Sequence, residues 1–369
     1  MPAETPRSAT VRVDLDALAR NYRALRARAE PGESAAVVKA NAYGLGVERV
    51  APRLEREGCR TFFVATLAEA RELRAVVAAA PAIYVFEGAV DGAVAALTEL
   101  NARPVLNTLE QVERWQGRGP AALHLDTGMN RLGLGLADVA ALAKRRELTA
   151  GLALVMTHLA CADEPEHPQN REQLERFERL RRELPAAPTS IGNSAGTWLG
   201  GPFRGDVVRP GIALYGGNPF SDRPNPMEAV VTLTAPVLQL RDVAEPQPVG
   251  YGATYLASPP ARLAVVGLGY ADGYPRNLGN RGTAAVQGRR VPVVGRVSMD
   301  LICVDVGALP RDLVRVGDPV ELIGPTVGLD EVAAEAGTIG YEILTGLGSR
   351  LTREYVEKAP SGTMAPAER

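Results

Sequence analysis

One lysine stands where an apolar run meets a glycine-containing turn. The stretch AAVVKANAYGLG (35–46) carries Lys39, and only two other lysines, Lys144 and Lys358, occur among 41 basic residues. Arginine supplies charge and phosphate contacts as well as lysine does, but only a lysine amine forms an imine. Lys39 is therefore a candidate nucleophile, although its position alone also fits a solvated strand end in an arginine-rich chain.

Other polar residues follow apolar runs further along the chain. They are Asp126 before TGMNRLG, His158, Gly192-Asn193-Ser194, and Arg209 before Pro210-Gly211-Ile212. The glycine-containing segments expose backbone N–H groups to an anion, with the Ser194 hydroxyl as a further donor. An imine-forming lysine beside a phosphate cradle is what pyridoxal phosphate requires. A sugar-phosphate aldolase that forms an imine would need the same pair, so both classes stay open at this point.

These residues meet only if the elements that carry them form a β/α barrel. Short apolar runs typical of strands alternate with amphipathic helical segments such as QNREQLERFERLRREL. The eight expected strands are 35–40, 61–65, 82–86, 103–106, 122–126, 152–158, 189–193 and 207–210. This order predicts a TIM-like (β/α)8 barrel, which gathers its active site at the carboxyl ends of the strands. An open doubly wound sheet is the alternative, but NAYGLG does not match its GxGxxG fingerprint.

The pattern changes after NPFSDRPNPME (218–228). Strand-like segments without intervening helices follow, separated by Pro, Gly and Asp turns: VVTLTAPVLQL, RLAVVGLG, RRVPVVGRV, LICVDV and DPVELIG. We expect an α/β protein with the barrel in residues 1–226 and a mainly-β domain in residues 227–369. VRVD (11–14) is typical of a strand that precedes the barrel and is free to pair with the C-terminal domain.

Charge and cysteine content exclude several classes of partner. The net charge is −2, with basic and acidic residues interspersed, which gives no basic surface for nucleic acid. No apolar run is long enough to span a membrane, and the first residues lack the apolar core of a signal peptide. Three widely spaced cysteines, Cys59, Cys161 and Cys303, indicate a reducing compartment. We therefore expect a cytoplasmic protein that binds a small molecule and neither nucleic acid nor a membrane.

Seven motifs follow one another along the chain: AVVKANAYGLG, HLDTGMNRLG, GNSAG, VVRPGIALYG, VGYGATY, GLGYADGYPR and GRVSMD. In this order they resemble the alanine racemases, pyridoxal-phosphate-dependent enzymes of fold type III, over both expected domains. The resemblance implies a homodimer with active sites shared between subunits. It also implies that L- and D-alanine are interconverted by two-base Cα proton exchange on a pyridoxal-phosphate aldimine, which supplies D-alanine for peptidoglycan in the cell wall. Substrate breadth and a catabolic role stay open.

The resemblance places the cofactor on the barrel. Lys39 would hold pyridoxal 5'-phosphate as an imine. Tyr43 would donate its hydroxyl to the phosphate, together with Ser194 and the backbone amides of Gly211 and Ile212.

Arg209 would face the pyridine nitrogen of the cofactor. A cation beside that nitrogen disfavours its protonation, which makes the ring a weaker electron sink. We therefore expect proton exchange at Cα to proceed while side reactions such as transamination are suppressed.

Racemisation requires acid/base groups on both faces of Cα. Lys39 would serve one face, and Tyr251 from the neighbouring subunit would serve the other. His158 would link Tyr251 to Arg209 by hydrogen bonds. The resemblance also implies that the Arg131 side chain contacts the substrate carboxylate or a cofactor oxygen. The backbone N–H of Met299 from the partner chain would bind the carboxylate.

Three positions depart from the family pattern or stay unassigned. The family often has a carbamylated lysine where this chain has His124, and a neutral imidazole cannot give Arg131 the negative charge of a carbamate. Ser349 lies in the region where some members carry a tyrosine that reaches the phosphate or the entrance. Asp272 either lines the entrance or caps a turn.

Four other functions can be weighed against this sequence: a metal site, a non-catalytic cofactor carrier, a decarboxylase and a broad-specificity racemase. His158, Cys161 and His167 lack the compact spacing and fourth ligand of a zinc site, so we expect no metal. A non-catalytic pyridoxal-phosphate carrier would need no second domain bearing Tyr251 and Met299. A basic-amino-acid decarboxylase and a broad-specificity racemase share the cofactor fold and stay as alternatives.

Overall fold

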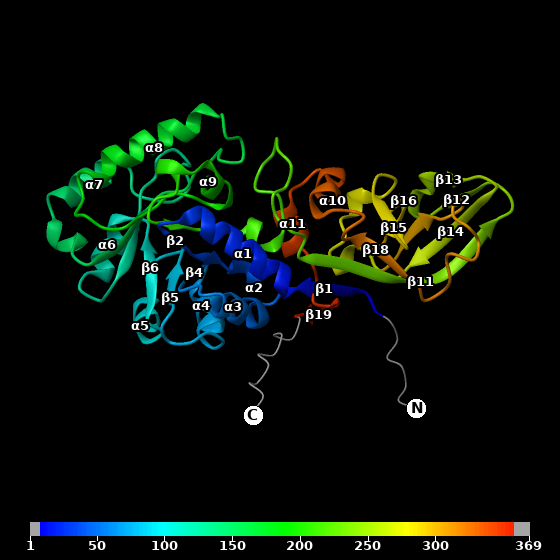
Figure 1. The fold of residues 1–369 in the computed structure, drawn as a ribbon, viewed down its shortest axis with the longest axis horizontal. Coiled ribbons are helices and arrows are strands. Elements are labelled where there is room, and N and C mark those ends of the chain that lie inside the picture. The colour runs from blue at the N-terminus through cyan, green and yellow to red at the C-terminus, as the bar shows by residue number, and fades with distance from the viewer. Residues whose placement is uncertain (1–7, 358–369) are drawn as a thin grey trace, which may run out of the picture. The chain divides into compact units, whose positions relative to one another are not determined.

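The computed structural model describes residues 8–357 and divides into two units, each built around its own sheet (Figure 1). One unit comprises residues 19–228. The other joins residues 8–18 with residues 229–357. Lys358 and the outer ends of both expected domains lie outside the described residues.

A curled parallel sheet of seven strands, in the order β3 to β9, forms the centre of the first unit. Its strands are β3 (Ala36–Val37), β4 (Thr61–Val64), β5 (Ala82–Val85), β6 (Ala102–Leu106), β7 (Ala121–His124), β8 (Leu152–Met156) and β9 (Thr189–Ser190). Two short strands, β2 (Glu33–Ser34) and β10 (Val207–Val208), pair with each other in parallel. The parallel order agrees with strands that alternate with helices along the chain.

Backbone hydrogen bonds around β10 close this sheet into a ring. On one side, the N–H of Arg209 donates to the Gly192 carbonyl at 2.8 Å. On the other side, the N–H of Val37 donates to the Pro210 carbonyl at 2.9 Å. The predicted β/α barrel is therefore confirmed, and an open doubly wound sheet is excluded.

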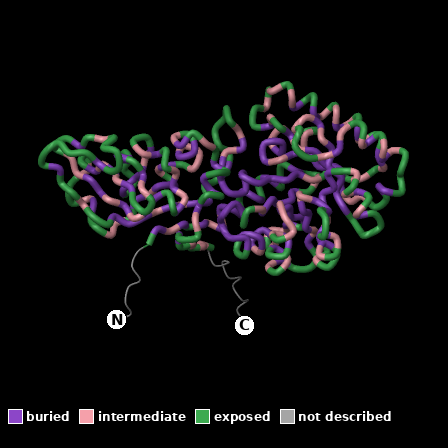
Figure 2. Tube along the Cα trace, turned by 180° about the vertical axis from the view of Figure 1, so that it is seen from behind, coloured by how far each residue is buried: buried purple, intermediate pink, exposed green. Residues whose placement is uncertain are grey.

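Helices cover the outside of the barrel, so its strands are buried on both faces. They are α1 (Leu15–Ala29), which begins in the other unit, α3 (Val47–Arg56), α4 (Leu67–Arg74), α5 (Val94–Glu99), α6 (Leu109–Trp115), α7 (Leu136–Ala143), α8 (Pro168–Arg181) and α9 (Ser194–Leu199). The short segment α2 (Lys39–Tyr43) is instead a left-handed turn that follows β3. Every residue of β4 and β7 is buried, as apolar parallel strands require. Figure 2 shows buried segments along the strands and exposed segments on the outer helices.

The second unit is a mainly antiparallel sheet in the order β14-β17-β16-β15-β18-β11-β1-β19. Its strands are β1 (Thr10–Asp14), β11 (Val231–Val243), β14 (Ala261–Val266), β15 (Thr283–Val286), β16 (Arg289–Val294), β17 (Ile302–Asp305), β18 (Pro319–Ile323) and β19 (Thr352–Val356), beside a hairpin of β12 (Gln247–Val249) and β13 (Tyr255–Ala257). The long strand β11 pairs with β18 and β1 over its first half and with β14 over its second. The N-terminal strand β1 lies between β11 and β19.

Two details differ from the sequence expectations. The expected strand 35–40 ends early, because β3 stops at Val37 and Lys39 begins the short helical segment α2. The second unit also contains two helices that the strand pattern did not indicate, α10 (Leu329–Ala336) and α11 (Gly340–Thr345). Helix α10 has acidic residues in its first turn, which favour the positive end of the helix dipole.

Candidate active site

Lys39 begins α2, directly after the barrel strand β3, and is half-buried. Its Nζ atom lies 5.8 Å from the centroid of the Phe86 ring. Burial, followed by the positive charge of Arg131, lowers the pKa of the Lys39 amine. Both effects favour the neutral amine, which is the form that attacks a carbonyl.

A left-handed turn follows Lys39, with φ between 52° and 56° at all four residues of 40–43. Such a conformation costs L-residues roughly 1–2 kcal/mol each. Two side chains hold it: the Glu69 carboxylate accepts from the Ala40 N–H at 2.8 Å, and Asn41 Oδ1 accepts from the Val47 N–H at 2.8 Å. Backbone strain of this kind is retained where the surrounding structure fixes it, often at functional sites.

A cluster of backbone donors surrounds Ser194 at the start of α9. Its hydroxyl oxygen accepts from the N–H groups of Gly211 at 2.9 Å and Ala213 at 3.3 Å. A Cβ atom at position 211 would lie 2.2 Å from the Tyr43 hydroxyl, so a larger residue there would displace the Tyr43 ring. The hydroxyls of Ser194 and Tyr43 thus meet an amide cradle of the kind that binds phosphate. Ser194 Oγ thus accepts from the amide of Ala213 as well as from that of Gly211, and the phosphate contacts expected for the amides of Gly211 and Ile212 stay predictions.

Arg209 is fully enclosed in the barrel unit, with 2% of its surface exposed. One terminal nitrogen donates to Ser190 Oγ at 2.5 Å, and the other donates to the Thr157 carbonyl at 2.6 Å. Its Nε is buried without a hydrogen-bond partner among the described residues. Burial lowers the pKa of Arg209 to about 9, so the guanidinium stays charged at neutral pH. An unpaired buried donor of this kind fits an acceptor such as an unprotonated ring nitrogen.

His158 lies beside this guanidinium, with Nδ1 3.5 Å from a terminal nitrogen of Arg209. Because arginine only donates hydrogen bonds, Nδ1 must be the acceptor, and Nε2 carries the proton of the neutral ring. Burial and the charge of Arg209 lower the pKa of His158 well below its usual value. A neutral His158 therefore has an N–H available to donate to another group.

His124 ends strand β7 and is buried. Its Nδ1 lies 2.8 Å from Asn107 Oδ1, while the Asn107 amide nitrogen donates to the carbonyls of Phe86 and Val105, each at 2.9 Å. The two carbonyls fix the Asn107 amide, so Nδ1 of His124 is the donor and Nε2 is an acceptor. Burial, followed by the charge of Arg209, lowers the pKa of His124 to about 4. The position therefore holds a neutral group at neutral pH.

The structure gathers most of the predicted site residues in the barrel unit. Arg131 lies within electrostatic range of Lys39, His124 and His158. Two predicted residues, Tyr251 and Met299, belong to the other unit. Tyr251 begins the short helical turn Tyr251–Ala253 and is 71% exposed, and Met299 is 53% exposed.

Four residues that support the site were not singled out in the sequence. Ser190 and Thr157 hold Arg209, Asn107 holds His124, and Glu69 holds the turn after Lys39. The first three lie at or just after the carboxyl ends of barrel strands. Their positions at the strand ends therefore predict them from the sequence. Glu69 is different, because its sequence context predicts only a helix capping box with Thr66.

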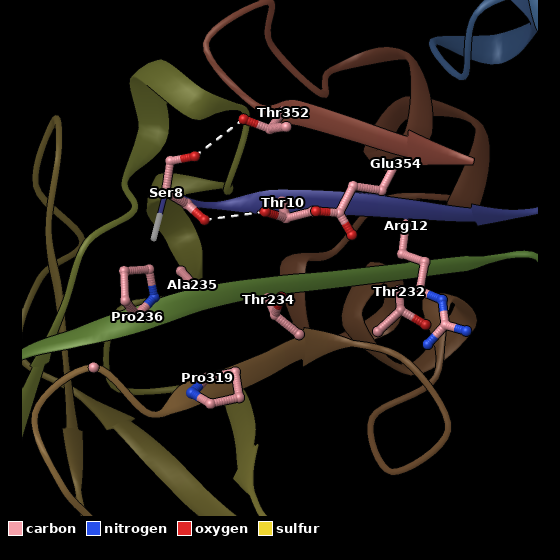
Figure 3. A pocket seen from close by; sticks show the side chains of 11 residues that line it. Ser8, Thr10, Arg12, Thr232, Thr234, Ala235, Pro236, Pro319, Thr352 and Glu354 are labelled. Carbon is pink, nitrogen blue, oxygen red and sulfur yellow. Dashed lines mark hydrogen bonds between the residues drawn. The ribbon is translucent and has the colours of Figure 1, made fainter. Parts of the chain in front are cut away.

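A surface pocket of about 730 Å³ lies in the second unit (Figure 3). It is lined by Ser8, Thr10, Arg12, Thr232, Thr234, Ala235, Pro236, Gly317, Pro319, Thr352 and Glu354. Arg12 faces Glu354 in register across β1 and β19, so opposite charges adjoin there. None of the predicted site residues lines this pocket. Within residues 8–357 there is no helix suited to span a membrane and no cluster of three or more metal-binding side chains.

Comparison with known proteins gives the same family for both parts of the chain. Residues 13–219 match the alanine racemase N-terminal domain, and residues 230–355 match the alanine racemase C-terminal domain. An alanine racemase of Methylobacterium nodulans is 49% identical over 97% of this chain and 98% of its own length. Further relatives are alanine racemases named catabolic and biosynthetic.

A solved structure gives the same answer for the fold. The alanine racemase of Bartonella henselae, with covalently bound pyridoxal phosphate, superposes with a TM-score of 0.91 at 41% identity, covering 95% of this chain and 100% of that one. The chain therefore belongs to the alanine racemase family of isomerases, whose cofactor is pyridoxal 5'-phosphate.

Proposed function

We propose that this chain interconverts L- and D-alanine by two-base proton exchange, with Lys39 and Tyr251 of the partner subunit as the two bases. The observation that carries the proposal is the buried Arg209 guanidinium. Ser190 and Thr157 hold its terminal nitrogens while its Nε is left without an acceptor among the described residues. This donor suits a pyridine nitrogen that is kept unprotonated.

The barrel residues are suited to hold pyridoxal phosphate. Lys39 would bind its aldehyde, and Tyr43, Ser194 and the amides around Gly211 would bind its phosphate. When bound, the cofactor supplies an electron sink that acidifies the Cα proton of the substrate. Because Arg209 stays charged, that sink is weak, which favours return of the proton to Cα over side reactions.

Proton transfer on the two faces requires two groups that alternate between acid and base. The lowered pKa of Lys39 brings its amine closer to neutrality. Tyr251 of the partner subunit is proposed for the opposite face, since its ring is exposed within its own chain. His158, whose Nδ1 accepts from Arg209, has its Nε2 proton left to donate to that phenol.

The substrate carboxylate is assigned to two groups. Arg131 supplies a positive charge near Lys39. The N–H of Met299 from the partner subunit supplies a backbone donor.

We further propose that the enzyme is a cytoplasmic homodimer and supplies D-alanine for peptidoglycan. The biosynthetic role is testable by depletion, which should make growth depend on added D-alanine, and independence would favour a catabolic role.

Two substitutions test the assignment of the bases. Lys39→Arg keeps the charge but cannot form an imine, so the purified protein should lose its visible absorbance band. Tyr251→Phe should lose racemisation by at least about 100-fold while it keeps that band, since general acid–base groups contribute about 10²–10⁴-fold. Lys144→Arg serves as the control for loss of a lysine. An unchanged spectrum would remove Lys39 from the mechanism, and near-normal turnover would remove Tyr251.

Product analysis tests the substrate. Chiral chromatography after incubation with alanine, serine and lysine, with carbon dioxide measured in parallel, separates racemases from decarboxylases. We expect alanine to be racemised fastest and no carbon dioxide to be released.

A further inference from the structure

Three loops of the second unit meet at glycines. They are residues 269–273, 298–301 and 346–350. A Cβ atom at Gly269 would lie 2.3 Å from the carbonyl oxygens of Ser298 and Met299, and one at Gly273 would lie 2.1 Å from the carbonyl oxygen of Gly346. Only glycine permits backbones to approach this closely.

Backbone hydrogen bonds fix one side of the Met299 peptide. The N–H of Tyr270 donates to the Ser298 carbonyl at 3.0 Å, and the N–H of Ala271 donates to the Met299 carbonyl at 3.0 Å. The N–H of Met299 itself has no acceptor in the part of the chain that the structure describes. The carbonyl of Met299 is therefore held by a hydrogen bond, while its N–H can donate to a ligand.

A single guanidinium joins all three loops. The Nε of Arg350 lies 3.1 Å from Asp272 Oδ1, and its Nη1 donates to Asp300 Oδ1 at 2.8 Å. Asp272 is 5% exposed, and its other oxygen accepts from the Gly269 N–H at 2.9 Å. Asp272 therefore caps its own turn and also anchors Arg350, which reaches the residue directly after Met299.

We propose that Asp272, Arg350 and Asp300 form a positioning bridge that holds the Met299 N–H in place for the substrate carboxylate. The proposal rests on the proposed function, which assigns that N–H to the substrate. An isolated exposed ion pair contributes little to stability. Here one arginine spans two carboxylates on separate loops, so its effect is on the geometry of the 298–301 loop.

The first test is made on the whole protein without reference to activity. Arg350→Ala should raise amide hydrogen exchange in peptides covering 298–301 and 269–273, while exchange in the barrel strands stays unchanged. Asp300→Ala, at an exposed position, should raise exchange at 298–301 as well. Arg311→Ala is the matched control, because it breaks another ion pair of the same unit, with Asp242 at 3.0 Å. Unchanged exchange at 298–301 in both bridge variants would overturn the proposal.

The second test uses the holoenzyme. Arg350→Ala should raise KM for L-alanine about tenfold with kcat changed less than about twofold, because a contact equal in ground and transition states affects binding alone. Arg350→Lys, which keeps the charge but cannot bridge both carboxylates, should recover part of this loss. The double variant Asp300→Ala/Arg350→Ala should match Arg350→Ala, since both disrupt one bridge.

The two tests separate two kinds of failure. If the wild-type enzyme does not racemise alanine, the proposed function fails, and the exchange measurement still decides whether the bridge holds the loop. If exchange rises but KM stays unchanged in an active enzyme, the loop is held by the bridge for another purpose, and the positioning role is wrong.

Discussion

At the scale of single residues, burial sets the charge states of the barrel site. Arg209 remains charged at neutral pH even with its pKa lowered to about 9, because Ser190 and Thr157 replace the water it lost. His158 and His124 have their pKa values lowered, first by burial and then by Arg209. Burial, reinforced by one enclosed cation, thus keeps both imidazoles neutral.

His124 makes stability depend on pH. Its pKa is about 4 in the folded chain against an ordinary value of 6.5, so the unfolded chain binds the extra proton between these values. The contribution of neutral His124 to the free energy of unfolding is therefore complete above pH 6.5. It is lost as the pH falls towards 4, and the total loss is roughly 3 kcal/mol. His124→Gln should reduce the slope of the melting temperature against pH in that window.

Melting curves measured from pH 4 to pH 8 check this expectation. His167→Asn, at the N-cap of α8, is the control for loss of a histidine elsewhere. A slope identical to wild type in His124→Gln would show that His124 does not titrate in this way.

At the scale of elements, the turn after Lys39 has a left-handed backbone conformation that its residues disfavour. Ala40 has a φ of 52°, where a Cβ atom is unfavourable, yet its N–H is held by Glu69. The barrel strand β3 therefore ends at Val37, and the chain turns at once so that Lys39 and Tyr43 both leave from the same strand end. The strained turn thus places two functional side chains, and the surrounding contacts compensate for the strain.

A pair of glycine substitutions tests this strain. Ala40→Gly should raise the melting temperature by about 1–2 °C, because relief of the left-handed strain slightly exceeds the entropy cost of glycine. Ala68→Gly, at an exposed position in the right-handed helix α4, should lower it by about 2–4 °C. Both are read from thermal unfolding curves, and a comparable fall in both variants would contradict the left-handed turn.

At the scale of the whole molecule, the proposed bases come from different units of the chain. Lys39 belongs to the barrel and Tyr251 to the mainly-β unit, which also includes the N-terminal strand β1. The strong exposure of Tyr251 and Met299 agrees with residues that act outside their own unit, Tyr251 through its phenol and Met299 through its backbone N–H. This arrangement supports the proposal that the partner subunit completes each site.

Hybrid dimers test that proposal. Lys39→Ala and Tyr251→Phe chains should each be inactive, yet mixing them should restore up to about a quarter of the wild-type activity. In a mixed dimer one site combines the two intact residues and the other combines the two substitutions. Racemase activity is measured after subunit exchange has been confirmed with differently tagged chains. Confirmed exchange without recovery would place both bases in one chain.

The sequence by itself determined the residue types that carry chemistry and the alternation of strands and helices. The rare Lys39, the glycine-containing anion segments and the apolar runs are local features, and the strand periodicity places their carboxyl ends at one mouth of a barrel. Motif resemblance then supplied Tyr251 and Met299, which no local pattern would have selected.

Only the tertiary structure decided which groups touch. The acceptors that hold Arg209, the Asn107 amide that sets the tautomer of His124, and the arginine bridge next to Met299 join residues 17 to 78 positions apart. Hydrogen bonds over such separations depend on register and packing, which side-chain periodicity does not encode. The sequence also does not predict the left-handed turn at 40–43, because alanine normally favours right-handed helices. Only contacts with the surrounding structure stabilise this conformation.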